Sequence, residues 1–302
     1  GMTIDGYEVL DEIHASTTSQ LYKVRDTESG EIFIMKTPSV HFEDDPAYIE
    51  RFYIEEWAGN LLNSNSVSKI HEQQRPRNFL YFIMEYIQGM TLRQWMNEHP
   101  LAEIKDVMSL TQGIIKGLRV FHRLEMLHRD LKPENIMIAK SGEVKIIDFG
   151  SVKIAGIHEI NTPVERLELL GTKNYTAPEY LLGGEGNNQS DIYSLGCTLY
   201  RLLTGKPMYE GATLMNRMMA HLNNPIPSLR ETRSEVPVAL DAVYQRMVAK
   251  SPDDRYQLMT EVIAALETRW APAAPAARPA PKKESSSDAA LSAFFENVSG
   301  QA

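Results

Sequence analysis

The stretch His128-Arg129-Asp130-Leu131-Lys132-Pro133-Glu134-Asn135 is followed shortly by Asp148-Phe149-Gly150. Asp130 can accept a hydrogen bond from an attacking hydroxyl group, and Lys132 can reach a transferring phosphate. Asn135 and Asp148 offer an amide oxygen and a carboxylate, which are ligands that a hard divalent cation prefers. Because phosphoryl transfer depends on positioning and charge neutralisation, this spacing predicts a phosphoryl-transfer site.

The residues between the two motifs predict a short strand. Val144, Ile146 and Ile147 follow a Ser141-Gly142 turn, so Asp148 is expected at a strand end. Any one of these polar residues taken alone is most often a solvated side chain or a cap. Their occurrence together, and in this order, favours a functional site.

These motifs resemble the catalytic loop and the Asp-Phe-Gly motif of Hanks-type (eukaryotic-like) serine/threonine protein kinases of the bacterial style, and the resemblance extends over residues 7–255. It implies an α+β, two-lobed protein kinase fold. The small lobe would be antiparallel β with one main helix, and the larger lobe mainly helical. We therefore expect a kinase domain at residues 1–270, with a small lobe (1–84), a hinge (85–89) and a large lobe (90–270).

The hydrophobic pattern agrees with this division. Strands are expected at residues 7–13, 21–26, 31–37, 67–70 and 80–84. An amphipathic helix is expected to begin at Pro46. Apolar residues recur at helical steps between residues 107 and 121, and residues 191–203 are apolar nearly all round, which predicts a buried central helix.

In the kinases that the chain resembles, a strand lysine holds the α- and β-phosphates of ATP and pairs with a helix glutamate. Lys36 ends the alternating stretch Ile32-Phe33-Ile34-Met35-Lys36 and would be that lysine. Glu55 matches the spacing of the glutamate, but a helix rotation of one residue would bring Glu56 to the same place. The expected catalytic residues are Asp130, Lys132, Lys36 and Glu55.

The resemblance also implies ATP and Mg²⁺ (or Mn²⁺) as cofactors. Asn135 and Asp148 would hold the metal ion, and they would contact the nucleotide together with Lys36. The adenine would meet the hinge backbone between Glu85 and Ile87, with Met84 behind it. The other residues expected to line the nucleotide site are Ile13, Leu21 and Ile34.

The chain departs from the family at the loop that covers the phosphates. The expected Gly-x-Gly-x-x-Gly pattern is absent, and His14, Ser16 and Ser19 stand at the three glycine positions. Glycine lets a backbone approach phosphates closely and accepts positive φ, so these side chains add bulk and narrow the conformations. Either the loop hydroxyls and amides bind the phosphates in another way, or the loop no longer covers the nucleotide.

Ala177-Pro178-Glu179 resembles the motif that ends the activation segment, and Glu179 is expected to form a structural pair with Arg255. Asp191, at the start of the predicted central helix, is also expected to be structural. Lys132 and Gly171-Thr172 resemble the serine/threonine branch of the family. A protein serine or threonine is therefore the expected acceptor.

Regulation by phosphorylation of the activation segment is a further hypothesis. Arg129 lies beside the proposed base and could bind a phosphorylated residue through charge-assisted hydrogen bonds. Thr162 is the best-placed hydroxyl, and Thr172 is a second regulatory candidate. Few hydroxyls lie between residues 151 and 170.

The composition is that of an ordinary globular protein, with 302 residues, 43% hydrophobic and 24% charged. The net charge of −9 argues against a nucleic-acid-binding surface. Neither a membrane segment nor a signal peptide is visible, and the single Cys197 fits a reducing compartment, so a cytoplasmic location is expected.

After Trp270 the sequence becomes rich in Ala, Pro and Ser, which predicts a linker at residues 271–288. A short tail at residues 289–302 could form a helix and dock a partner. Two other functions stay open. The protein could be a weak or inactive kinase-fold binding module or scaffold, or a kinase of small molecules, although residues 148–179 are long enough to form a peptide-docking platform.

Overall fold

The computed structural model of the protein describes residues 1–42, 44–157 and 174–270. The chain divides into two compact units, Gly1–Trp270 and Ala271–Ala302, and all described residues belong to the first. The predicted linker and tail therefore lie outside the described residues. No helix among the described residues is long and apolar enough to cross a membrane.

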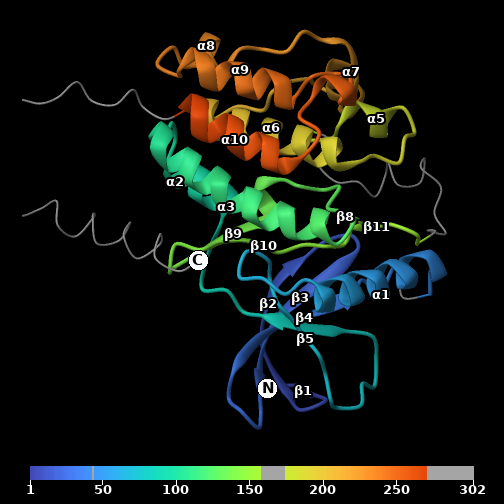
Figure 1. Ribbon diagram of the computed structural model, residues 1–302. Coiled ribbons are helices and arrows are strands. Elements are labelled where there is room, and N and C mark those ends of the chain that lie inside the picture. The colour runs from blue at the N-terminus through green and yellow to red at the C-terminus, as the bar shows by residue number, and fades with distance from the viewer. Residues whose placement is uncertain (43, 158–173, 271–302) are drawn as a thin grey trace, which may run out of the picture. The chain divides into compact units, whose positions relative to one another are not determined.

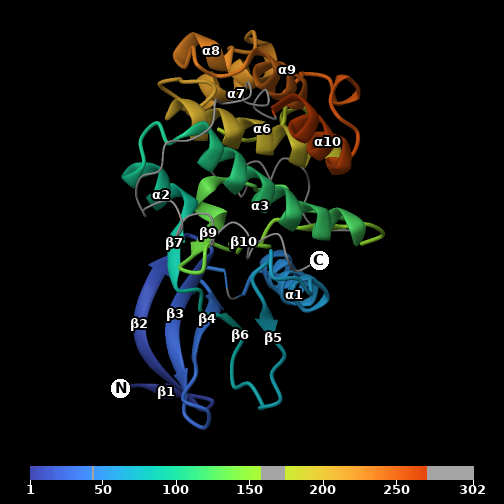
Figure 2. The same ribbon diagram turned by 60° about the vertical axis from the view of Figure 1, so that its left-hand side comes forward.

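The small lobe is a six-stranded antiparallel sheet with the strand order β1-β2-β3-β4-β6-β5. Figure 2 shows the sheet with the helix α1 beside it. The elements of this lobe are β1 (Thr3–Ile4), β2 (Tyr7–Ala15), β3 (Ser19–Asp26), β4 (Ile32–Pro38), α1 (Pro46–Leu61), β5 (Ile70–His71) and β6 (Phe82–Glu85).

The helix α1 begins where the sequence predicts. Asp45 is its N-cap, and the Asp45 carboxylate accepts hydrogen bonds from the amides of Ala47 and Tyr48. Pro46 occupies the first turn, where its missing N–H costs no hydrogen bond. α1 contacts β5 and lies beside the sheet in Figure 1.

Two strand predictions are wrong in detail. The strands β2 and β3 extend toward each other, so only residues 16–18 remain as a turn. Val67 does not belong to a strand of the small sheet but forms an isolated bridge with Ile146 of the large lobe. The amide of Ser68 donates to the Ile146 carbonyl at 2.7 Å. Residues 67 and 68 are therefore bound to the large lobe, and the strand β5 begins only at Ile70.

The two faces of the small sheet have different surroundings. Side chains alternate along a strand, so Ile34 and Lys36 lie on one face of β4 and Met35 lies on the other. Met35, Tyr22 and Val9 line a cavity of about 610 Å³ on that other face. The opposite face carries Lys36 and therefore belongs to the predicted site.

The large lobe is mainly helical, with two small sheets, β10-β9-β7 and β11-β8, on its side nearer the small lobe (Figure 1). Its elements are β7 (Gly89–Thr91), α2 (Leu92–Glu98), α3 (Ile104–Arg123), β8 (Met126–Leu127), η1 (Pro133–Asn135), β9 (Ile136–Ala139), β10 (Val144–Ile146), β11 (Lys153–Ile154), α5 (Pro178–Leu181), α6 (Asn188–Thr204), α7 (Leu214–Asn223), α8 (Leu229–Thr232), α9 (Val238–Met247), η2 (Pro252–Asp254) and α10 (Met259–Trp270).

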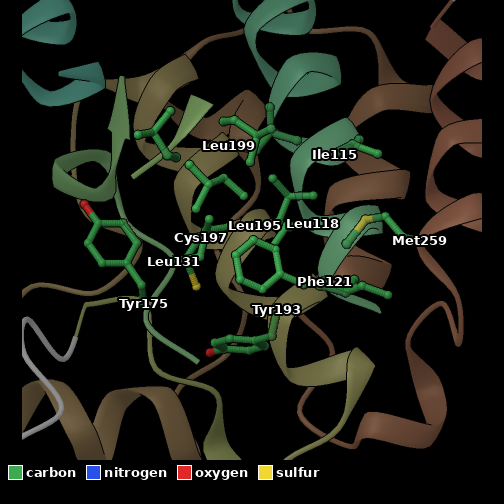
Figure 3. Close-up of a cluster of buried hydrophobic side chains, with 14 of the residues drawn as sticks. Ile115, Leu118, Phe121, Leu131, Tyr175, Tyr193, Leu195, Cys197, Leu199 and Met259 are labelled. Carbon is green, nitrogen blue, oxygen red and sulfur yellow. The ribbon is translucent and has the colours of Figure 1, made fainter. Parts of the chain in front are cut away.

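The predicted buried central helix is confirmed as α6. It begins with a capping box between Asn187 and Ser190 and ends at Gly205, whose φ of 74° favours glycine. α6 packs against α3 and α9. Figure 3 shows Cys197 of α6 in a buried cluster with Phe121 of α3, so this cysteine is a core residue, as the sequence predicts.

Candidate active site

The face of β4 opposite Met35 carries Lys36, and α1 brings Glu55 to it. The Lys36 Nζ lies 2.6 Å from the Glu55 Oε1, and both residues are buried. Glu56 instead binds Arg77, at 2.8 Å, so the helix rotation left open by the sequence is settled in favour of Glu55. Burial alone would lower the pKa of Lys36, but the carboxylates of Glu55 and Asp148 outweigh it and raise the pKa. Lys36 therefore stays charged.

Asp148 faces the same lysine from the large lobe. Its Oδ1 lies 3.9 Å from the Lys36 Nζ and accepts a hydrogen bond from the amide of Gly150 at 2.8 Å. Burial would raise the pKa of Asp148, but Lys36 and the Gly150 amide lower it below its ordinary value. The neighbouring Phe149 is buried against Phe121, at 5.6 Å between ring centroids. Asp148 thus stays ionised and directed toward Lys36.

The catalytic loop, residues 128–135, holds a second cluster of polar side chains, Asp130, Lys132 and Asn135. The Lys132 Nζ lies 3.2 Å from the Asp130 Oδ2. The Asn135 Nδ2 donates to the Asp130 carbonyl at 2.8 Å and to its Oδ2 at 3.1 Å. These bonds commit the amide nitrogen to Asp130 and leave the amide oxygen as the group that can bind a cation. Burial raises the pKa of Asp130, against the opposing effect of Lys132.

Asp191 of α6 fixes the backbone of this loop through hydrogen bonds. Its fully buried carboxylate accepts hydrogen bonds from the amides of His128 and Arg129, at 2.9 and 3.0 Å. His122 Nε2 lies 2.8 Å from the same carboxylate. Burial would raise the pKa of Asp191, but His122, His128 and the amides lower it. Arg129 has a φ of 66°, which is uncommon for a residue other than glycine.

The residues expected around the adenine lie where β4 meets β6 and the hinge. Ile34 pairs with Met84 across the two strands, and both are buried. The Glu85 carboxylate binds Lys145 at 2.9 Å and the Lys69 amide at 2.9 Å, and the Glu85 amide donates to the Lys69 carbonyl at 2.9 Å, so neither the carboxylate nor the amide of Glu85 is left for a nucleotide. Ile87 is half-buried in the segment between β6 and β7.

The remaining predicted contacts of the nucleotide lie on β2 and β3. Leu21 is opposite Lys36 in the register of β3 and β4, and it is half-buried. Ile13 lies at an irregularity of β2, between Glu12 and His14, and is 48% exposed. The structure therefore places Leu21 next to Lys36 and leaves Ile13 largely exposed.

The loop without glycines is a tight turn that satisfies its own backbone. The Ser16 Oγ accepts hydrogen bonds from the amides of Thr18 and Ser19, at 3.3 and 3.0 Å. The Ser16 amide donates to the Ser19 carbonyl at 2.8 Å. Two amides that could bind phosphate are thus already occupied by the serine that stands at a glycine position.

The activation-segment motif ends in the predicted structural pair. The guanidinium of Arg255 binds both carboxylate oxygens of Glu179, at 2.8 and 2.9 Å, and Arg255 is fully buried. Arg129 donates from Nε to the Ser151 carbonyl at 2.6 Å. Thr162 and Thr172, the other two regulatory candidates, lie outside the described residues.

Sequence reasoning missed three residues around the site. His122 binds Asp191 but is separated from it by 69 residues in the sequence, so no local signal marks it. Arg51 and Tyr48 precede Glu55 on α1 by four and seven residues, which are helical steps along one face. That spacing was the available signal for Arg51 and Tyr48.

The ligands present suit magnesium. Asn135 and Asp148 supply one amide and one carboxylate oxygen, and no group of three His, Cys, Asp or Glu that could hold a metal ion occurs among the described residues. Mg²⁺ binds through one or two carboxylates and completes its shell with waters and phosphate oxygens. The site therefore fits a metal ion that arrives with a nucleotide, rather than a metal held by protein alone.

Two lobes that bring a strand lysine, paired with a helix glutamate, toward the aspartate of an Asp-Phe-Gly motif define the class of protein kinases. The family model of the protein kinase domain matches residues 7–270, and the chain belongs to this family.

Among curated proteins, the chain is 32% identical over 273 residues to the probable serine/threonine-protein kinase PknB of Lactococcus lactis, covering 85% of this chain and 42% of that protein. It is 28% identical to the serine/threonine-protein kinase PrkC of Bacillus subtilis, covering 89% of this chain and 41% of PrkC. The chain thus spans about two fifths of the length of these relatives. The solved kinase domain of Mycobacterium tuberculosis PknI has a similar fold, with a TM-score of 0.68, 22% identity and coverage of 89% of this chain and 98% of that one.

Proposed function

We propose that this protein transfers the γ-phosphoryl group of ATP to serine or threonine hydroxyls of proteins. The observation that carries the proposal is a pair of polar clusters, Lys36 with Glu55 and Asp148, and Asp130 with Lys132 and Asn135. The two clusters are close enough for Lys132 to lower the pKa of Asp148. The names of PknB and PrkC agree with it. The kinase domain is proposed to comprise residues 1–270, with a linker and tail after it.

In the proposed reaction the substrate hydroxyl oxygen forms a bond to the γ-phosphorus as the bond between that phosphorus and the bridging oxygen of ADP breaks. Asp130 accepts the hydrogen bond of the hydroxyl and takes its proton as the reaction proceeds. Lys132, 3.2 Å from Asp130, is placed to offset the negative charge of the transferring group. The electron pair of the broken bond stays with ADP.

Lys36 is the proposed ligand of the α- and β-phosphates. It stays in place because Glu55 binds it within a buried environment. Asn135 and Asp148 are the proposed ligands of Mg²⁺ (or Mn²⁺), which when bound would neutralise charge on the phosphate oxygens. Ile34, Met84, Leu21 and the backbone from Glu85 to Ile87 would enclose the adenine, with a smaller contribution from Ile13.

The choice of a protein serine or threonine rests on the resemblance of Lys132 and Thr172 to that branch of the family and on the length of the segment between Asp148 and Glu179. A small-molecule kinase would have no use for such a segment. We also propose that the protein works in the cytoplasm, since ATP is its substrate and its single cysteine is a buried thiol. Phosphorylation of Thr162 and a role for Arg129 in binding it stay predictions.

One observation favours a second function. The turn at residues 16–18 has its amides of Thr18 and Ser19 bound to Ser16 Oγ, so the phosphates lose donors that glycine loops offer. A kinase-fold module that binds a partner, with weak or no turnover, would have this feature. We favour the enzyme, because the turn affects nucleotide positioning but does not remove the base or the metal ligands.

The test is transfer of label from [γ-³²P]ATP with Mg²⁺ to a mixture of peptides that carry Ser, Thr or Tyr as the sole hydroxyl. We expect incorporation into Ser and Thr peptides by the wild type and a large loss in the Asp130→Asn variant. Nucleotide binding without transfer by either protein would support the binding module instead. Transfer to metabolites but to no peptide would support the small-molecule kinase.

A further inference from the structure

Three polar side chains of α1 lie on one face of the helix. Tyr48, Arg51 and Glu55 are separated by three and four residues, which places them in one stripe along the helix. Glu55 is the residue that binds Lys36. Tyr48 and Arg51 have polar side chains and are half-buried. Neither has a role in the site described above.

Tyr48 contacts the turn that lacks glycines. Its hydroxyl donates a hydrogen bond to the carbonyl of Thr18, and the amide of Ser39 donates to the same carbonyl at 2.9 Å. The Tyr48 ring packs on Phe42, with 5.1 Å between centroids. Burial raises the pKa of Tyr48 to about 12, so the hydroxyl keeps its proton and remains a donor at neutral pH.

Arg51 contacts the turn that follows Asp148. Its Nη1 donates to the Val152 carbonyl at 2.9 Å, and its Nη2 donates to the Gly150 carbonyl at 2.6 Å. A planar guanidinium with two directed donors fixes such a pair of carbonyls better than a lysine could. Because Gly150 is two residues from Asp148, this contact fixes the backbone that carries the proposed metal ligand.

We propose that Tyr48 and Arg51 are positioning residues through which α1 sets the turn at residues 16–18 and the turn after Asp148 relative to the Lys36–Glu55 pair. This inference rests on the proposed function and deepens it. A glycine loop settles on phosphates through its own backbone freedom. A turn of Ser and Thr lacks that freedom, so its place over the site is set from outside, by the Tyr48 hydroxyl.

Glu55, Tyr48 and Arg51 share one face of α1, but they contact three different parts of the chain. Lys36 lies on β4, Thr18 lies between β2 and β3, and Gly150 lies after β10. One helix therefore contacts the strand of Lys36, the turn at residues 16–18 and the turn after Asp148. A displacement of α1 would move the lysine pair, the turn and the Asp148 backbone together.

The first test compares Tyr48→Phe with Tyr53→Phe, a matched control because Tyr53 lies on the same helix and is 51% exposed. Binding of ADP with Mg²⁺ and of adenosine is measured by calorimetry. Loss of one hydrogen bond should weaken ADP binding by Tyr48→Phe roughly fivefold, while adenosine binding stays within about twofold. Tyr53→Phe should match the wild type for both ligands. Equal weakening of ADP and adenosine by Tyr48→Phe, or no change in either, would overturn the role of Tyr48.

Hydrogen exchange without any nucleotide tests the contact separately from catalysis. Peptides that cover residues 14–20 should exchange faster in Tyr48→Phe than in Tyr53→Phe, with melting temperatures within a few degrees of each other. Unchanged exchange would refute the contact. If the wild type bound nucleotide but transferred no phosphate, the proposed activity would fail while this measurement could still support the contact.

The second test concerns Arg51. Arg51→Met should lower kcat about tenfold with a smaller effect on the KM for ATP, because Asp148 is misplaced but the adenine contacts remain. Lys116→Met is the control, since it removes one exposed positive charge from α3. If Arg51→Met fails to fold by circular dichroism, Arg51→Lys replaces it and should show a loss in the same direction. A kcat within twofold of the wild type in the folded variant would overturn the role of Arg51.

Discussion

The catalytic loop at residues 128–135 and the turn at residues 16–18 face the same proposed site but are held in different ways. Backbone amides of the catalytic loop donate hydrogen bonds to the fully buried carboxylate of Asp191, which lies far along the chain. The turn is held by Ser16, within its own few residues, and by the hydroxyl of Tyr48. The loop proposed to perform the chemistry is thus anchored to the core through Asp191, whereas the turn depends on its own serine and on one contact from α1.

The largest effect is expected on the catalytic-loop side. Asp130→Asn keeps the shape of the side chain but removes the group that accepts the proton. General base catalysis commonly contributes a factor of about 10² to 10⁴, so we expect kcat to fall by roughly a thousandfold. Single-turnover transfer from labelled ATP measures this effect.

The control for Asp130→Asn is the binding of ADP with Mg²⁺, which should change little because Lys36 and Asp148 are untouched. Retention of more than a tenth of the wild-type kcat would contradict the assignment of Asp130.

The next largest effect is expected at the buried ion pair between Lys36 of β4 and Glu55 of α1. Glu55→Gln leaves the buried Lys36 without its nearest anion, and removing one partner of a buried pair costs about 3 to 5 kcal/mol of the free energy of unfolding. Glu56→Gln is the matched control, because the bond between Glu56 and Arg77 is partly exposed and should contribute less than about 1 kcal/mol. Urea denaturation of both variants measures the difference. Equal losses in the two would refute the distinction between these neighbours.

The pH dependence of kcat/KM should report Asp130. Burial raises the pKa of Asp130 above its ordinary value of 3.8. Since the ionised carboxylate is the active form, activity is present above the raised pKa and is lost tenfold per pH unit as the pH falls through it.

Lys132 opposes this shift, so Lys132→Ala should move the acid limb to higher pH. Circular dichroism at each pH separates this effect from unfolding. An acid limb that moves to lower pH in Lys132→Ala would contradict the electrostatic account.

The smallest effect is expected at the turn. Ser16→Gly removes the Oγ that occupies the amides of Thr18 and Ser19, and it restores a glycine at the family's position. The two freed amides can donate to the phosphates, so the KM for ATP should fall by a few fold. The conformational entropy that the added glycine loses when the turn is ordered should offset part of this gain. Ser29→Gly, in the turn between β3 and β4, is the control and should leave the KM unchanged. A higher KM in Ser16→Gly would show that the serine orders the turn more than it blocks it.

The sequence predicts the catalytic loop at residues 128–135 far better than the turn at residues 16–18. Asp130, Asn135 and Asp148 follow from local motifs whose residue types match the chemistry. The choice between Glu55 and Glu56 depends on the rotation of α1 about its axis, which is set by packing against the sheet. The length of the turn was mispredicted because hydroxyl side chains, unlike glycines, do not mark where strands end.

Contacts between distant segments were also beyond the sequence. His122 and Asp191 meet only because α3 and α6 pack together. The apolar character of Val67 predicts a strand of the small sheet, but its backbone pairs with Ile146 of the other lobe. In both cases the local pattern is compatible with several partners, and tertiary packing selects one.

The left-handed backbone of Arg129 has a consequence for the order in which the protein assembles. A residue in this conformation costs about 1 to 3 kcal/mol unless the surrounding structure holds it, and Asp191 of α6 holds it here. α6 leaves the ribosome after the catalytic loop has been synthesised. We therefore expect a nascent chain that stops before residue 188 to contain every motif residue of that loop and yet lack its active geometry.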